Sequence, residues 1–225
     1  MKRVLEAIAA RQARFAAQPF FKRLEGVGTV EEARAFAPQL TFFVMVFQDI
    51  LRVNEAKVKD PALRKVARHH RVEDRGHDNW FLHDLDQLGV THGIGWLFGP
   101  RHAATRDAAY ALMSEVHRAS GDHVRVALLL VLEATGDAFF SRIPGFMARA
   151  GFDKPLKYFS EAHHQVERNH EMFERRMQEE LRALVVPGEV EAEALAMVER
   201  AFDTMEGMVA GFAASMERAA SPAVA

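Results

Sequence analysis

The sequence contains no cysteine, and this absence removes several classes of chemistry at once. Disulfide frameworks, thiolate zinc sites, iron–sulfur clusters and cysteine nucleophiles all require a thiol. Any metal bound by this chain must therefore be held by imidazole and carboxylate groups. Such ligands suit iron, manganese or zinc.

The chain also lacks an excess of charge of either sign, because 29 Lys and Arg residues stand against 31 Asp and Glu residues. Nucleic acids and anionic membranes favour a basic surface, so we expect neither as a partner. The longest apolar run, Ala127 to Leu132, is too short to span a bilayer. The first residues, Met1 to Glu6, mix charges where a signal peptide has an apolar stretch. We therefore expect a cytoplasmic protein.

Strand-like alternation of apolar and polar residues is absent, and helical periodicity dominates the chain. Short connections and the lack of a long linker predict an all-α fold, a single bundle of seven to eight helices over residues 1–225. Asp60 and Pro61 are typical of a helix start, and Gly89 is typical of a helix end. The predicted helices cover about 2–16, 30–57 (or from Pro38), 61–88, 103–119, 123–142, 155–185 (capped by Asp153) and 190–219, with a break at 143–145.

Two of these helices repeat the pattern His-x-x-x-acid-x-x-His. Positions i, i+4 and i+7 fall on one stripe of a helix, so each helix can present two imidazoles and a carboxylate to the same side. The residues are His70, Asp74 and His77 in the third helix, and His163, Glu167 and His170 in the sixth.

A lone carboxylate, Glu133, follows an apolar stretch of the fifth helix, and we expect it to be buried. A buried carboxylate requires a cation or strong hydrogen bonds, and a metal ion meets this need. Asp137, one turn later, is a weaker candidate because its surroundings are less apolar.

Dimetal carboxylate bundles use an acid-x-x-His pair from each of two helices and a lone glutamate from each of two others. Asp74-x-x-His77 and Glu167-x-x-His170 match the pairs, and Glu133 matches one glutamate. The second lone glutamate has only weak counterparts in Asp49 and Glu55. We therefore expect His70 and His163 to supply the missing ligands. The phenylalanines are expected mostly to pack in the core, with some lining a pocket beside the metals; they are Phe42, Phe43, Phe47, Phe139 and Phe140. Trp80 and Tyr158 lie about a turn from the ligand stripes and are expected to pack, with a redox role as the alternative.

In these motifs the chain resembles the haem-oxygenase-like diiron oxidases and oxygenases, iron-containing redox enzymes that share a fold with haem oxygenase, TenA-type thiaminases and PqqC-type oxidases. The ligand positions of that family fall on His70, His77, Glu133, His163, Glu167 and His170, and the stretches 73–77, 84–85, 88–89 and 132–136 are also similar. Many members place a glutamate where His70 stands. Whether His70, Glu73 or Asp74 completes the first site therefore stays open.

The resemblance implies a haem-oxygenase-like bundle that holds two iron ions, with manganese as a possible substitute, and uses O2 to oxidise a small organic molecule. It does not identify the substrate. One alternative is a metal-free TenA-like or PqqC-like enzyme, although a TenA-like thiaminase needs a cysteine that this chain lacks. Another is a metal-binding or haem-binding helical protein without catalysis. A homodimer through the amphipathic first or last helix is a further expectation.

Overall fold

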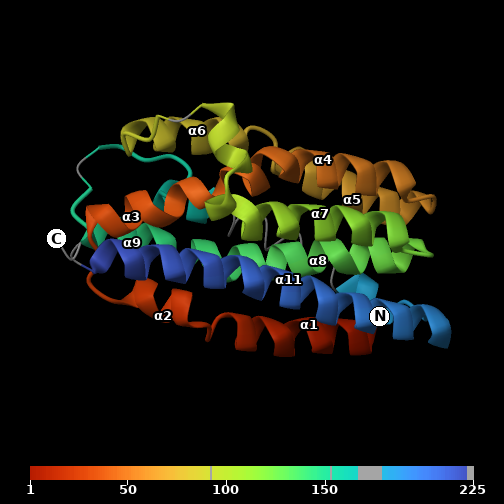
Figure 1. The fold of residues 1–225 in the computed structure, drawn as a ribbon. Helices are drawn as coiled ribbons and strands as arrows, with labels where there is room; N and C mark the ends of the chain where they lie inside the picture. Colours follow the sequence, from red (N-terminus) through yellow and green to blue (C-terminus); the bar gives the residue numbers. More distant parts are fainter. Residues whose placement is uncertain (92, 153, 167–178, 222–225) are drawn as a thin grey trace.

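The computed structural model describes residues 1–91, 93–152, 154–166 and 179–221, and within these ranges it contains helices and no strand. The predicted all-α class is therefore confirmed. The long helices run side by side as one bundle (Figure 1). They are α1 (Lys2–Phe15), α4 (Thr41–Lys57), α5 (Pro61–Glu73), α7 (Ala103–Arg118), α8 (Asp122–Phe140) and α11 (Gly188–Ala220).

Shorter helices close the ends of the bundle. Helices α2, α3 and α9 gather at one end, on the left in Figure 1. The 3-10 turns connect longer elements. The bounds are α2 (Pro19–Glu25), α3 (Val30–Phe36), α6 (His77–Gln87), α9 (Ile143–Arg149), η1 (Ala37–Leu40), η2 (Ile94–Phe98) and η3 (Pro100–His102).

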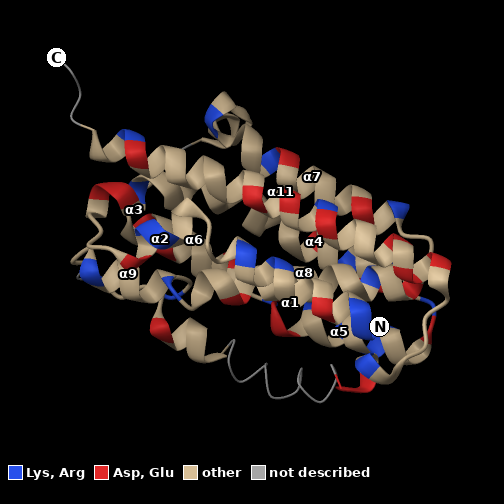
Figure 2. Cartoon of the chain, turned by 90° about the horizontal axis from the view of Figure 1, so that it is seen from below, with Lys and Arg blue, Asp and Glu red and all other residues tan. Residues whose placement is uncertain are grey.

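Helix α8 forms the centre of the core. Five consecutive residues, 128–132, are all buried, so the helix is covered on every side there. It packs against α1, α4, α5, α7, α9 and α11. An apolar helix without a polar stripe is stable only when neighbours surround it in this way. Figure 2 shows acidic and basic residues interspersed over the outer helices, without a large area of one sign on the side seen.

One stretch of the described chain, Val30–Lys57, is long and apolar enough to cross a membrane by composition alone. Half of its most apolar window is buried inside the bundle, and α4 packs against α5, α6, α7 and α8. The core helix of a soluble protein passes the same test, so the stretch is weak support for a membrane span. The cytoplasmic location stays a prediction.

The single helix predicted over 61–88 is wrong, because the chain turns a corner between α5 and α6. Helix α5 ends at Glu73, and α6 begins at His77. Between them Gly76 has a φ of 93°, in the left-handed region that residues with a Cβ rarely adopt. The hydrophobic periodicity on either side of this glycine hid the corner.

Other boundaries also differ from the sequence prediction. The helix predicted over 30–57 is divided into α3, η1 and α4, and α2 was not predicted. Residues 143–145 do more than end α8, because Pro144 lies in the first turn of α9, where a missing N–H costs no hydrogen bond. The helix predicted from Pro155 is not helical until 161. There Ser160 Oγ accepts a hydrogen bond from the backbone N–H of His163, which is a typical helix cap. Asp153, the predicted cap, lies outside the described residues.

Replacing Gly76 by alanine should destabilise the protein by about 1–2 kcal/mol, because the left-handed backbone strains any residue with a Cβ. An added Cβ would meet no atom within 4 Å, so backbone strain is the only expected cost. Urea unfolding followed by circular dichroism measures this change. Gly207→Ala, at an open helical position of α11, is the matched control and should stabilise by about 0.5–1 kcal/mol. Equal stability of the Gly76→Ala protein and the unaltered chain would contradict the assigned corner.

Candidate functional site

A chain of alternating carboxylates and imidazoles links α8 to α5 and α6. Glu133 Oε1 lies 2.9 Å from His70 Nδ1, and His70 Nε2 lies 3.2 Å from Asp74 Oδ2. Asp74 Oδ1 then lies 3.1 Å from His77 Nδ1. Asp74 thus bridges two imidazoles with its two oxygens, just before the corner at Gly76. The corner lets His77 face the same carboxylate although it belongs to a different helix.

The carboxylates and imidazoles of this series stabilise each other's charged forms. Burial alone would lower the pKa of His70, but the nearby carboxylates of Glu133 and Asp74 raise that pKa well above its ordinary value. Burial would raise the pKa of Asp74, but hydrogen bonds with His70 and His77 lower it well below the usual range. His70 is therefore an imidazolium between two carboxylates when no metal competes with its proton.

Among the described residues, three members of the carboxylate–imidazole series lie close enough together to bind one cation. One ligand atom each from His70, Asp74 and Glu133 lies within 4.8 Å of the other two. Nitrogen and carboxylate oxygen suit iron, manganese or zinc. The donor set and the spacing therefore fit a metal ion.

The three residues considered for completing the first metal site, His70, Glu73 and Asp74, make different contacts. His70 and Asp74 both belong to this group, whereas Glu73 pairs with His69 at 2.8 Å. The two weak candidates in α4 are engaged elsewhere, Asp49 with Arg52 and Glu55 with Arg71.

His163 lies in an aromatic environment next to His77. The residue is only 1% exposed. The centroid of its ring lies 4.4 Å from the ring centroid of His77 and 4.3 Å from that of Phe140. His163 Nδ1 lies 2.7 Å from the carbonyl oxygen of Tyr158. A carbonyl only accepts, so Nδ1 carries the proton and Nε2 holds the lone pair in the neutral ring, the form of a metal-ligating histidine. Glu167 and His170 lie outside the described residues.

A second buried carboxylate, Asp84 in α6, holds the backbone that leads to His163. Asp84 is fully buried and accepts hydrogen bonds from the backbone N–H groups of Lys157 (2.7 Å) and Phe159 (2.9 Å). These bonds place the carbonyl of Tyr158, which orients the His163 ring. They also explain why 155–160 is not helical, because its N–H groups bond to a side chain instead of the preceding turn.

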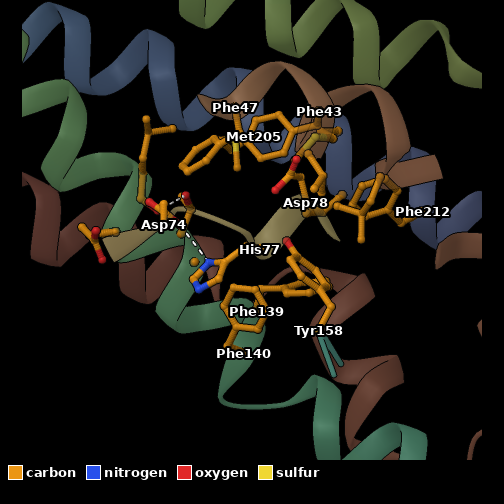
Figure 3. Close-up of a pocket in the computed structure, with 18 of the residues that line it drawn as sticks. Phe43, Phe47, Asp74, His77, Asp78, Phe139, Phe140, Tyr158, Met205 and Phe212 are labelled. Atoms are coloured by element: carbon orange, nitrogen blue, oxygen red, sulfur yellow. Dashed lines mark hydrogen bonds and ion pairs between the residues drawn. The ribbon is translucent and has the colours of Figure 1, made fainter. Parts of the chain in front are cut away.

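A cavity of about 90 Å³ adjoins the carboxylate–imidazole chain, and His70, Asp74, His77 and Glu133 form part of its wall. Most of the remaining wall is aromatic or thioether (Figure 3). Of the phenylalanines considered for a pocket, Phe43, Phe47, Phe139 and Phe140 line it, and Tyr158 lines it as well. Phe42 instead packs against Phe98 and Tyr110, and Trp80 stacks on His77.

Two polar residues of the cavity wall, Gln48 and Asp78, were not identified from the sequence. Asp78 left no usable signal, because a helix face shared with Asp74 would require the continuous helix over 61–88 that the corner at Gly76 interrupts. Gln48 has no signal either, because its position depends on how α4 packs against the site. Asp137, the weaker ligand candidate, lies outside the cavity wall and accepts a hydrogen bond from the side-chain amide of Gln12.

A comparison of the chain with protein-family models and with curated protein sequences finds no match. The resemblance to haem-oxygenase-like diiron enzymes therefore rests on the motifs alone.

Replacing Asp84 by asparagine should lower the free energy of unfolding by at least about 2 kcal/mol. The neutral amide loses charge-assisted hydrogen bonds, and its NH2 group cannot accept from a backbone N–H. Denaturant unfolding measures the loss. Asp86→Asn, an exposed change on the same helix, is the control and should stay within about 0.5 kcal/mol. An Asp84→Asn protein as stable as the control would show that the hydrogen bonds from 157 and 159 to Asp84 contribute little to the free energy of unfolding.

Proposed function

We propose that this protein is a nonhaem diiron oxidase or oxygenase that uses O2 to oxidise a small organic molecule. The observation that carries the proposal is the group of His70, Asp74 and Glu133 in the wall of a mainly apolar cavity. Metal ligands beside a cavity place a reactive centre where an organic substrate can reach it.

In this proposal His70, Asp74, His77 and Glu133 hold metal from α5, α6 and α8. The sequence pattern adds His163, Glu167 and His170 as the ligands of the sixth predicted helix. Bound ferrous ions would supply electrons and open coordination positions for O2. Manganese is the alternative metal, since the same donors suit it.

The chain's own residues have three tasks in this scheme. Asp74 limits the rotation of the His70 and His77 rings, because each of its oxygens engages one ring. The hydrogen bond from His163 Nδ1 to Tyr158 fixes the tautomer of His163. The phenylalanine and methionine walls exclude water and leave room for an apolar substrate.

Loading the metal-free protein anaerobically with ferrous iron should give about two iron ions per chain by elemental analysis. Glu133→Ala and His170→Ala should each lose one or both ions, because each removes a proposed ligand. Exposure to O2 should then produce a transient visible absorption in the unaltered chain. Asp137→Asn, one turn from Glu133 and exposed, is the matched control and should keep full occupancy.

Full occupancy in both ligand variants would show that the site is assigned wrongly. No iron in the unaltered chain, and no change in melting temperature with metal, would favour a metal-free TenA-like or PqqC-like enzyme. Metal that binds without any reaction with O2 would favour a non-catalytic metal-binding protein. A Soret band after mixing with haem would favour a haem-binding one.

Metal affinity should increase with pH, because a metal ion must displace the proton of His70. The carboxylates raise the pKa of His70, so the ring still holds a proton near neutral pH, and the gain continues until the pH passes that pKa. Zn2+ titrations by calorimetry between about pH 6 and 8 measure both affinity and proton release. His70→Gln should bind more weakly and lose this part of the pH dependence. His117→Gln, on an exposed face of α7, should change neither, and an affinity independent of pH in the unaltered chain would contradict the role of His70.

A further inference from the structure

Among the residues that the structure describes, no cation pairs with Asp78, a partly exposed carboxylate in the wall of the cavity beside the proposed metal site. Asp78 is in the first turn of α6 and lines the cavity together with Phe43, Met205 and Phe212 (Figure 3). Among the described residues its hydrogen-bond partner is the neutral side-chain amide of Asn79, with Nδ2 3.2 Å from Oδ1. The other carboxylates of the wall, unlike Asp78, are matched by imidazoles.

A second polar group in the same wall has no hydrogen-bond partner within the described part of the chain. Gln48 of α4 lines the cavity, and its Nε2 is buried without a hydrogen bond. A buried polar group without a partner is costly, so Gln48 needs a hydrogen-bond partner inside the cavity, and a polar ligand that displaces water would supply one. A terminal amide can turn by 180° and exchange its nitrogen for its oxygen. Gln48 can then offer an acceptor at the point where its nitrogen is unsatisfied.

The rest of the wall sets the character of the ligand. No Lys or Arg side chain belongs to the part of the wall that the structure describes. An anionic ligand would therefore add charge to carboxylates, whereas a cation would balance Asp78. The aromatic rings of the wall favour an apolar body and also attract a cation at their faces. A volume of about 90 Å³ suits a short chain rather than a large ring system.

We propose that the cavity binds a small apolar primary amine as the substrate of the site. Its ammonium group donates hydrogen bonds to Asp78 and Gln48, and its alkyl or aryl body contacts the phenylalanine and methionine walls. As a statement about a substrate, this inference rests on the proposed function. As a statement about binding, it can be tested without iron or O2.

Calorimetric titration of the full metal-free chain with n-hexylamine, hexanoate and 1-hexanol tests the ligand class, because these probes share one alkyl body. Hexylamine should bind about tenfold more tightly than either of the others, since a hydrogen bond to a charged group contributes most. Amines from propyl to hexyl should gain about fourfold in affinity per methylene until the cavity is full. Equal or tighter binding of hexanoate or hexanol, or no binding of any probe, would overturn the proposal.

The variant Asp78→Asn should weaken hexylamine binding about tenfold and leave hexanol binding unchanged. Asp86→Asn, an exposed change in the same helix, should leave both unchanged. Where Asp78→Asn does not fold by circular dichroism, Gln48→Leu takes its place and should weaken hexylamine binding while strengthening hexanol binding. Hexylamine affinity unaffected by both cavity variants would also overturn the proposal.

Iron content and O2 consumption of the same protein keep the two proposals separate. A chain that binds iron and consumes O2 but prefers hexanoate refutes the amine and leaves the diiron function in place. A chain that prefers hexylamine but binds no iron refutes the diiron function and leaves the amine site in place.

Discussion

The carboxylate of Glu133 is the group around which the site is organised. It follows seven consecutive buried apolar residues of α8, 126–132, yet its side chain in the cavity wall is 28% exposed, so the expected burial of Glu133 is only partial. A carboxylate in such surroundings needs a cation or strong hydrogen bonds. His70 meets this need, and it lies on the same buried face of α5 as Leu63 and Ala67. Asp74 then follows on the same face and engages the second nitrogen of His70.

Much of this arrangement could be predicted because it depends on local patterns. The apolar stretch of α8 drew attention to Glu133, and the four-residue spacing of His70 and Asp74 predicted a shared face. The corner at Gly76 could not be predicted, because helical periodicity continues across it and only the positive φ shows the break. The non-helical segment 155–160 depends on Asp84, a residue distant in the chain. Gln48 reaches the cavity through tertiary packing, which leaves no trace in a local pattern.

The proposed site combines two environments that usually exclude each other. On one side carboxylates and imidazoles form a continuous hydrogen-bonded chain, and on the other side phenylalanine and methionine side chains form an apolar wall. Both environments are held by well-packed elements. Helix α8 is enclosed by its neighbours, and Asp84 connects α6 by hydrogen bonds to the segment before His163. Such support limits the movement of groups that must hold a fixed geometry.

The corner at Gly76 also affects how such a site can diverge in evolution. Within one helix each inserted residue rotates everything that follows by about 100°, so the spacing between two ligands cannot change without loss of one of them. A corner resets this rotation, because the direction of α6 is set by its own packing and by Asp84. The interval between His70 and His77 is therefore not fixed by the geometry of a single helix, and related chains could differ in it. A sequence search that requires a fixed spacing would then miss relatives that keep the same site.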